Sequence, residues 1–197
     1  MRAFTFENAT KIYFGGGCVK EHLLEAVKPY GETVMLAYGG GSIKTNGIYQ
    51  EVMDVLKLAG KQVIEFSGIT PNPTYSKVME GKKVVQENQV DLILAVGGGS
   101  VMDCSKAISM AAATDKDVWE EYWIKKGEID FEPVPVGVIV TVVGTGSEVN
   151  GEGVITHEEQ KIKTSRNYPR CNPVFAMMDP KYTYTVSPLQ TAAGGFD

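Results

Sequence analysis

The chain has 197 residues, of which 43% are hydrophobic, and a formal net charge of -5 at pH 7. This length and composition support one domain with a sizeable core, and the negative charge argues against a nucleic-acid partner, which normally meets a basic surface. No stretch reaches the roughly 18 to 20 apolar residues of a membrane-spanning helix, and the start is too polar for a secretory signal. Three widely spaced cysteines indicate neither disulfides nor a zinc cluster. We therefore expect a cytoplasmic protein.

The first elements are short. Residues 4–14 alternate weakly, which predicts a short hairpin or an edge strand, and the glycine triplet 15–17 then serves a turn. Apolar residues at helical spacing over 19–27 predict a helix. Residues 33–38 form the first compact apolar run and predict a buried strand.

Two apolar runs each end in three glycines and a serine, followed by a helical pattern, which after the second run spans residues 102–113. Residues 33–38 precede Gly39, Gly40, Gly41 and Ser42, and residues 90–96 precede Gly97, Gly98, Gly99 and Ser100. Glycines let backbone amides approach a ligand, and the N-terminus of the next helix favours an anion. The pattern favours the diphosphate of a nucleotide. The alternative is a strand-to-helix turn that needs glycine only for its backbone angles.

Further strands and helices alternate along the chain. A strand over 62–66, a helix over 75–87 and a buried strand over 135–140 accompany the two glycine patterns. This alternation predicts an α/β fold, a Rossmann-like parallel sheet with helices on both faces. Its ligand loops should lie at the carboxyl ends of the strands. A P-loop is excluded because Ile43 precedes Lys44 where that motif needs glycine, and no G-x-G-x-x-G fingerprint is present.

The segment after strand 135–140 carries hydroxyl groups. Thr141, Thr145 and Ser147 stand in a loop loosened by two glycines, and such donors suit the ribose, carboxamide and phosphates of a dinucleotide. The alternative is a solvated connection. Nearby aromatic residues within 119–123 are interpreted as packing anchors rather than a stacking platform.

The last part of the chain turns β-like before a final helix. Residues 154–156 and 162–165 flank a polar turn and predict a hairpin, and residues 174–178 predict another strand. Ser187 and Pro188 then form a helix start.

Six motifs in order resemble one family. The sequence is similar to the N-terminal half of the iron-containing (group III) alcohol dehydrogenases, especially the butanol dehydrogenase and broad aldehyde reductase branch. The resemblance covers nearly the whole chain. The motifs that carry it are Tyr38-Gly39-Gly40-Gly41-Ser42-Ile43-Lys44, Gly68-Ile69-Thr70-Pro71-Asn72-Pro73, residues 95–103, residues 144–148, Met178-Asp179-Pro180 and Ala192-Ala193-Gly194-Gly195-Phe196-Asp197.

The resemblance implies roles for individual residues. Gly97 to Ser100 would hold the cofactor diphosphate, with Asp103 near the nicotinamide, and Gly39 to Ser42 would lie beside the adenosine ribose. The remaining implied roles are a cleft lined by Thr141, Thr145 and Ser147, a ribose contact from Lys163 and a first metal ligand at Asp197. His22 and His157 do not match the family's metal histidines, which lie in a C-terminal helical domain.

The resemblance also implies a chemistry. A hydride would pass between the nicotinamide of NAD or NADP and a primary alcohol or aldehyde such as butanol or butanal, while a divalent metal, iron or zinc, polarises the substrate oxygen. Residues 1–197 would form the nucleotide-binding half, cut at the start of the metal-binding domain and inactive alone. The expected partners are the dinucleotide, a small alcohol or aldehyde and a second copy in a homodimer, with no nucleic acid and no membrane.

Two alternatives stay open. A dehydroquinate-synthase-like lyase shares the architecture, although its late loop would not match residues 144–148, and a stand-alone nucleotide-binding module would suit a chain without metal histidines. Within the dehydrogenase reading, residues 39–42 lack a carboxylate, while Ser42 and Lys44 suit a phosphate. The sequence therefore predicts that NADP(H) is accepted and preferred.

Overall fold

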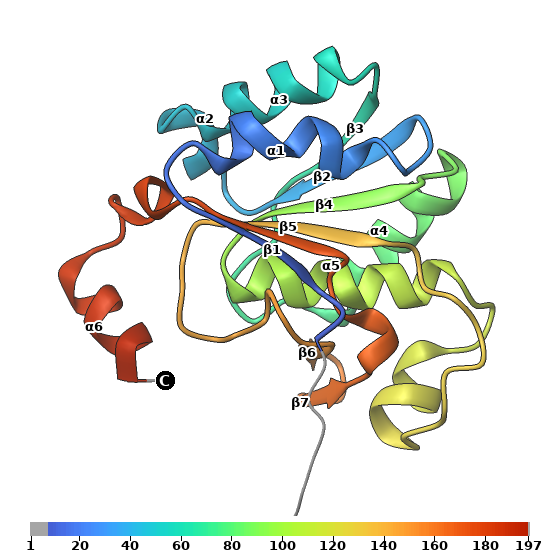
Figure 1. The fold of residues 1–197 in the computed structure, drawn as a ribbon. Helices are drawn as coiled ribbons and strands as arrows, with labels where there is room; N and C mark the ends of the chain where they lie inside the picture. Colours follow the sequence, from blue (N-terminus) through green and yellow to red (C-terminus); the bar gives the residue numbers. More distant parts are fainter. Residues whose placement is uncertain (1–7, 197) are drawn as a thin grey trace, which may run out of the picture.

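A six-stranded parallel sheet organises residues 8–196, the part of the chain that the structure, a computed structural model, describes (Figure 1). The strand order is β1-β8-β5-β4-β2-β3, and every neighbouring pair is parallel. The predicted α/β class and all four expected apolar strands are confirmed. The strands are β1 (Lys11–Phe14), β2 (Thr33–Tyr38), β3 (Gln62–Phe66), β4 (Leu92–Gly97), β5 (Val136–Val140) and β8 (Phe175–Met178).

Helices cover both faces of the sheet, as predicted. Because side chains alternate along a strand, Val34 and Leu36 of β2 join the core under one face, while Met35 and Ala37 join the core under the other. Figure 1 shows α1 and α3 on the first face and α4 and α5 on the second, while α6 lies off both faces and packs through Gly194 against the loop after β5. The helices are α1 (Cys18–Val27), α2 (Ser42–Thr45), α3 (Ile48–Leu58), α4 (Tyr75–Glu87), α5 (Gly99–Ala112) and α6 (Pro188–Phe196).

Two boundaries differ from the sequence-based predictions. The helix expected after Ser42 is two helices, α2 and α3, separated at Gly47, whose φ of 83° lies in the left-handed region that favours glycine. The helix expected from residue 102 begins at Gly99, inside the glycine run. The N-terminal segment was predicted as a short hairpin or an edge strand, and its described residues confirm the edge strand, since β1 ends the sheet and pairs with β8.

A separate two-stranded hairpin packs against α5. It consists of β6 (Glu152–His157) and β7 (Ile162–Asn167), which pair antiparallel as predicted. The π-helical turn Trp119–Ile124 buries both tryptophans and Tyr122, so the aromatic residues are packing anchors. Two 3-10 turns, Pro169–Cys171 and Pro180–Thr183, flank β8. Within residues 8–196, no helix has the length and apolar character needed to cross a membrane.

Candidate functional site

Three loops meet at the carboxyl edge of the sheet. They follow β2, β4 and β5, and β4 pairs with both of the other strands. The Thr141 N–H donates to the Gly97 carbonyl across 3.0 Å, which ties the third loop to the second. On the other side, a Cβ built on Gly39 would lie 3.9 Å from Val101 Cγ2, so the first and second loops are also adjacent. The structure thus brings the two glycine turns and the hydroxyl loop together.

The glycines at 97–99 are required by close packing rather than by their backbone angles. None of the three has a positive φ. A Cβ on Gly97 would lie 2.5 Å from the Val101 side chain, one on Gly98 3.0 Å from Val142, and one on Gly99 2.8 Å from Thr145. Side chains here would force the loops apart. The alternative explanation, a turn that needs glycine only for backbone angles, is therefore wrong at this position.

The first glycine turn leaves its backbone open. Gly41 has a φ of 101°, whereas Gly40 has an ordinary φ and no atom within 4 Å of the position a Cβ would occupy. The turn borders a cavity of about 290 Å³, lined by Tyr38, Gly39, Gly40, Gly41, Lys44, Ser67 and Gly68. A ligand can approach the main chain here without meeting a side chain.

The N-terminus of α5 is built to receive an anion. Gly98 is its N-cap and offers no side chain to the first turn. An α-helix leaves its first N–H groups without partners inside the helix, and the dipole places positive charge at that end. The half-buried Ser100 adds a hydroxyl to the same turn. Together these groups can bind a phosphate or diphosphate.

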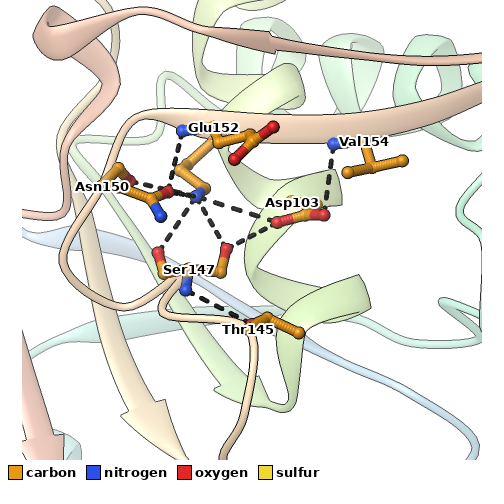
Figure 2. A network of polar contacts seen from close by, with 7 residues as sticks. Asp103, Thr145, Ser147, Asn150, Glu152 and Val154 are labelled. Atoms are coloured by element: carbon orange, nitrogen blue, oxygen red, sulfur yellow. Dashed lines mark hydrogen bonds and ion pairs between the residues drawn. The ribbon is translucent and has the colours of Figure 1, made fainter. Parts of the chain in front are cut away.

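Figure 2 shows a polar network behind this turn. Asp103 Oδ1 accepts a hydrogen bond from Ser147 Oγ at 2.5 Å, and Asp103 Oδ2 accepts one from the Val154 N–H at 3.2 Å. One carboxylate on α5 therefore holds both the hydroxyl loop and β6. Asp103 and Ser147 are both buried in the structure and bonded to each other.

Lys106 lies at the centre of the network and was missed by sequence reasoning. Its side chain is only 2% exposed, and Nζ donates to the Ser147 carbonyl at 3.0 Å, to Ser147 Oγ at 2.7 Å and to the Asn150 carbonyl at 3.1 Å. The ammonium lies 3.8 Å from Asp103. Burial lowers the pKa of Lys106 to about 8 and raises the pKa of Asp103. A lysine three residues after Asp103 on a largely apolar helix was the available signal.

The other predicted residues lie in different settings. Thr141 is buried, and the exposed Thr145 accepts the Ser147 N–H through Oγ1 at 3.3 Å. Lys163 is exposed on β7 and donates to Asn72 Oδ1 at 2.5 Å, so it lies on the hairpin and is not part of the three loops. The predicted metal ligand, Asp197, lies outside the described residues. Within those residues, no three His, Cys, Asp or Glu side chains are grouped to hold a metal.

A second cavity at the same edge of the sheet was also missed. It has a volume of about 190 Å³ and lies at the ends of β1, β5 and β8. Asp179 at its rim accepts the Gly17 N–H at 2.6 Å, which fixes the turn before α1. Its walls are mostly apolar, and only the Met178-Asp179-Pro180 motif had marked this region in the sequence. The lining residues are Phe14, Val140, Val143, Met178, Asp179, Pro180 and Thr183.

The fold and these loops define a Rossmann-like α/β protein with its ligand edge at the carboxyl ends of a parallel sheet. Residues 9–180 match the family model described as iron-containing alcohol dehydrogenase. The chain belongs to this family.

Relatives and solved structures agree with that assignment. The chain is 44% identical to the probable NADH-dependent butanol dehydrogenase 1 of Bacillus subtilis and 39% identical to the NADPH-dependent aldehyde reductase YqhD of Escherichia coli, covering 100% of this chain and 50% of each relative. The crystal structure of NADH-dependent butanol dehydrogenase A from Thermotoga maritima matches with a TM-score of 0.92 and 38% identity, over 100% of this chain and 49% of that one. The chain thus spans about half the length of these proteins and corresponds to their N-terminal half.

Proposed function

We propose that this chain is the cofactor-binding half of an oxidoreductase that transfers a hydride between NAD(H) or NADP(H) and a primary alcohol or aldehyde such as butanol or butanal. The observation that carries the proposal is the uncapped N-terminus of α5, which opens from a glycine turn directly beside the hydroxyl loop. Its relatives of similar identity are named as NADH- and NADPH-dependent enzymes of this kind.

The residues of the site have distinct roles in the proposal. The amides of Gly97 to Ser100 bind the diphosphate at the helix N-terminus, and Thr141 and Thr145 offer hydroxyls to the cofactor. Asp103 and Ser147, at the nicotinamide side, hold the loop against α5, while Lys163 contacts a ribose. Gly39–Ser42 contact the adenosine ribose of the cofactor. The nicotinamide supplies the hydride chemistry, and the protein supplies its position.

In this proposal, the metal site of the complete enzyme lies outside residues 8–196. In the complete enzyme, Asp197 would be the first ligand of an iron or zinc ion, which would supply Lewis-acid chemistry at the substrate oxygen. The described residues do not fit a metal, since no three ligand side chains are grouped there. We propose that the 197-residue chain binds the dinucleotide but does not turn over substrate.

Calorimetric titration of the purified chain with NADH and NADPH tests this function. Saturable binding of at least one dinucleotide is expected, together with no butanal-dependent loss of NADPH absorbance when ferrous or zinc ion is added. Ser100→Asp should weaken binding about tenfold or more, because its carboxylate repels the diphosphate. The same charge favours the helix N-terminus, so the melting temperature should not fall. Absence of dinucleotide binding, or unchanged binding by Ser100→Asp, would overturn the proposed site.

A further inference from the structure

Four polar side chains from separate elements converge beside the first glycine turn. Glu65, near the end of β3, accepts hydrogen bonds from the Tyr38 hydroxyl at 2.6 Å and the Tyr49 hydroxyl at 2.7 Å. Lys44 of α2 donates to the same carboxylate at 3.0 Å. Tyr38 ends β2 and Tyr49 lies in α3, so the carboxylate connects two strands and two helices.

The cluster holds Lys44 in place. Its Nζ lies 4.5 Å from the centre of the Tyr49 ring and 5.3 Å from that of Tyr38, within the range of a cation–π contact. The hydroxyls of Tyr38 and Tyr49, followed by Lys44, lower the pKa of Glu65 to about 2. Tyr38 and Glu65 raise the pKa of Lys44. Both groups are therefore charged at neutral pH, and their charges cancel.

One member of this pair, Lys44, borders the cavity at the Gly39–Gly41 turn, and Glu65 is bonded to Lys44 Nζ at 3.0 Å just outside that lining. Lys44 lines the cavity, and it is the one charged side chain in that lining. A 2′-phosphate on a ribose carries about -1.5 to -2 charges. It would gain from Lys44 but would also meet the ionised Glu65 beside it. An unmodified 2′-hydroxyl carries no charge, so the ionised Glu65 beside Lys44 does not repel it.

We propose that Glu65 is a specificity-determining residue that disfavours a 2′-phosphorylated adenosine ribose and so shifts the cofactor preference toward NAD(H). The inference rests on the proposed function, because it places the adenosine ribose at the Gly39–Gly41 turn. It replaces the sequence-based preference for NADP(H), whose premise was the lack of a carboxylate in residues 39–42. The fold supplies the carboxylate from β3, a strand that lies next to β2 in the sheet.

Overall similarity does not decide this preference. The NADH-dependent and NADPH-dependent relatives are 44% and 39% identical to the chain, which is nearly the same. The local charge around Lys44 is what distinguishes a phosphate from a hydroxyl, since electrostatic complementarity sets specificity more than it sets total affinity.

The test compares dissociation constants for NADH and NADPH, by calorimetry at one fixed ionic strength, between the chain and its Glu65→Gln variant. Glutamine keeps the size and one acceptor oxygen but removes the charge. NADPH affinity should rise about tenfold, while NADH affinity changes by less than about threefold. Glu87→Gln, at the exposed C-terminal end of α4, changes the total charge equally and should leave the NADH-to-NADPH ratio unaltered.

A second variant keeps the test decisive if Glu65→Gln folds poorly. Lys44→Gln leaves the carboxylate without its cation and should lower NADPH affinity several times more than NADH affinity. Failure of both dinucleotides to bind the unmodified chain would refute the proposed function. If both bind, and neither Glu65→Gln nor Lys44→Gln changes their ratio, the role of Glu65 is refuted while the function stands.

Discussion

Lys106 shows how one buried charge can organise a loop that has no regular structure. Residues 141–151 contain neither helix nor strand, yet they are held against α5 by a single ammonium and its partner Asp103. A buried charge is tolerated only when its donors are used and a counter-ion is near, and both conditions are met here. The loop that carries the proposed cofactor hydroxyls therefore depends on a side chain that would not itself touch the cofactor.

Replacing Lys106 should be costly. Lys106→Met would leave the Asp103 carboxylate buried without its cation and the Ser147 and Asn150 carbonyls without a donor, so we expect a loss of about 3 to 5 kcal/mol in the free energy of unfolding. Urea denaturation measures this loss in the free energy of unfolding. Lys57→Met, on the exposed side of α3, is the matched control and should change stability by less than about 0.5 kcal/mol. A loss of the same size in both variants would contradict this role.

The same side chain predicts a pH dependence. Burial lowers the pKa of folded Lys106 to about 8 from the ordinary value of 10.5. Between these values the unfolded chain binds more protons than the folded one, so the contribution of Lys106 to the free energy of unfolding rises with pH. The stability difference between wild type and Lys106→Met should therefore widen from pH 8 to 10.5. A difference that stays constant or shrinks in urea titrations across this range would contradict the prediction.

Gly40 can be replaced by a charged residue without a steric clash. A side chain there meets no atom within 4 Å, and its φ is ordinary, so Gly40→Asp should fold normally. The new carboxylate would face the cavity beside Lys44 and repel a 2′-phosphate. NADPH affinity should fall about tenfold more than NADH affinity in calorimetric titrations. Equal losses for the two cofactors would show that the adenosine ribose does not bind at this turn.

At the scale of elements, the start of α5 is controlled by its neighbours. Gly99→Ala would place a methyl group 2.8 Å from Thr145, and because the two loops pack directly, the hydroxyl loop must move. We expect a loss of about 1 to 3 kcal/mol and weaker dinucleotide binding. Gly40→Ala, with open space around the new methyl group, is the control for stability and should leave the melting temperature unchanged. Thermal denaturation and calorimetry measure both effects, and equal behaviour of the two alanine variants would contradict this packing argument.

Comparing the predicted elements with the observed ones shows which features a local sequence pattern reveals. The strands β2, β4 and β5 are buried on both faces, so each is a continuous apolar run that local pattern reveals. The start of α5 was placed three residues late because glycine is a poor helix former and only tertiary packing overrides that tendency. The side chains and carbonyls that bond to Glu65 and Lys106 lie 16 to 44 residues away, so local pattern offers at most the spacing of Asp103 and Lys106 and does not reveal either network. Asp103 and Ser147 were predicted separately as cofactor-site residues, which stays a prediction, and the hydrogen bond between them was not predicted.

For the molecule as a whole, several large apolar side chains remain uncovered at the carboxyl edge and along α6. Phe14 is 73% exposed, Leu189 80% and Phe196 93%. Exposed apolar groups gathered in one region favour association. Sedimentation of the 197-residue chain should show concentration-dependent self-association, and combined Phe14→Ser and Leu189→Ser substitution should reduce it. A chain that stays monomeric at all concentrations would contradict this.

The pairing of β1 with β8 has a consequence for synthesis on the ribosome. Lys11 pairs with Phe175, so the first strand to leave the exit tunnel cannot take its place until the last strand of the sheet has emerged. At about 5 to 20 residues per second, that delay is roughly 10 to 30 s. In that time β2, β3, β4 and β5 can already assemble, since they are neighbours in the sheet. The nascent β1 stays accessible to chaperones and proteases until β8 arrives.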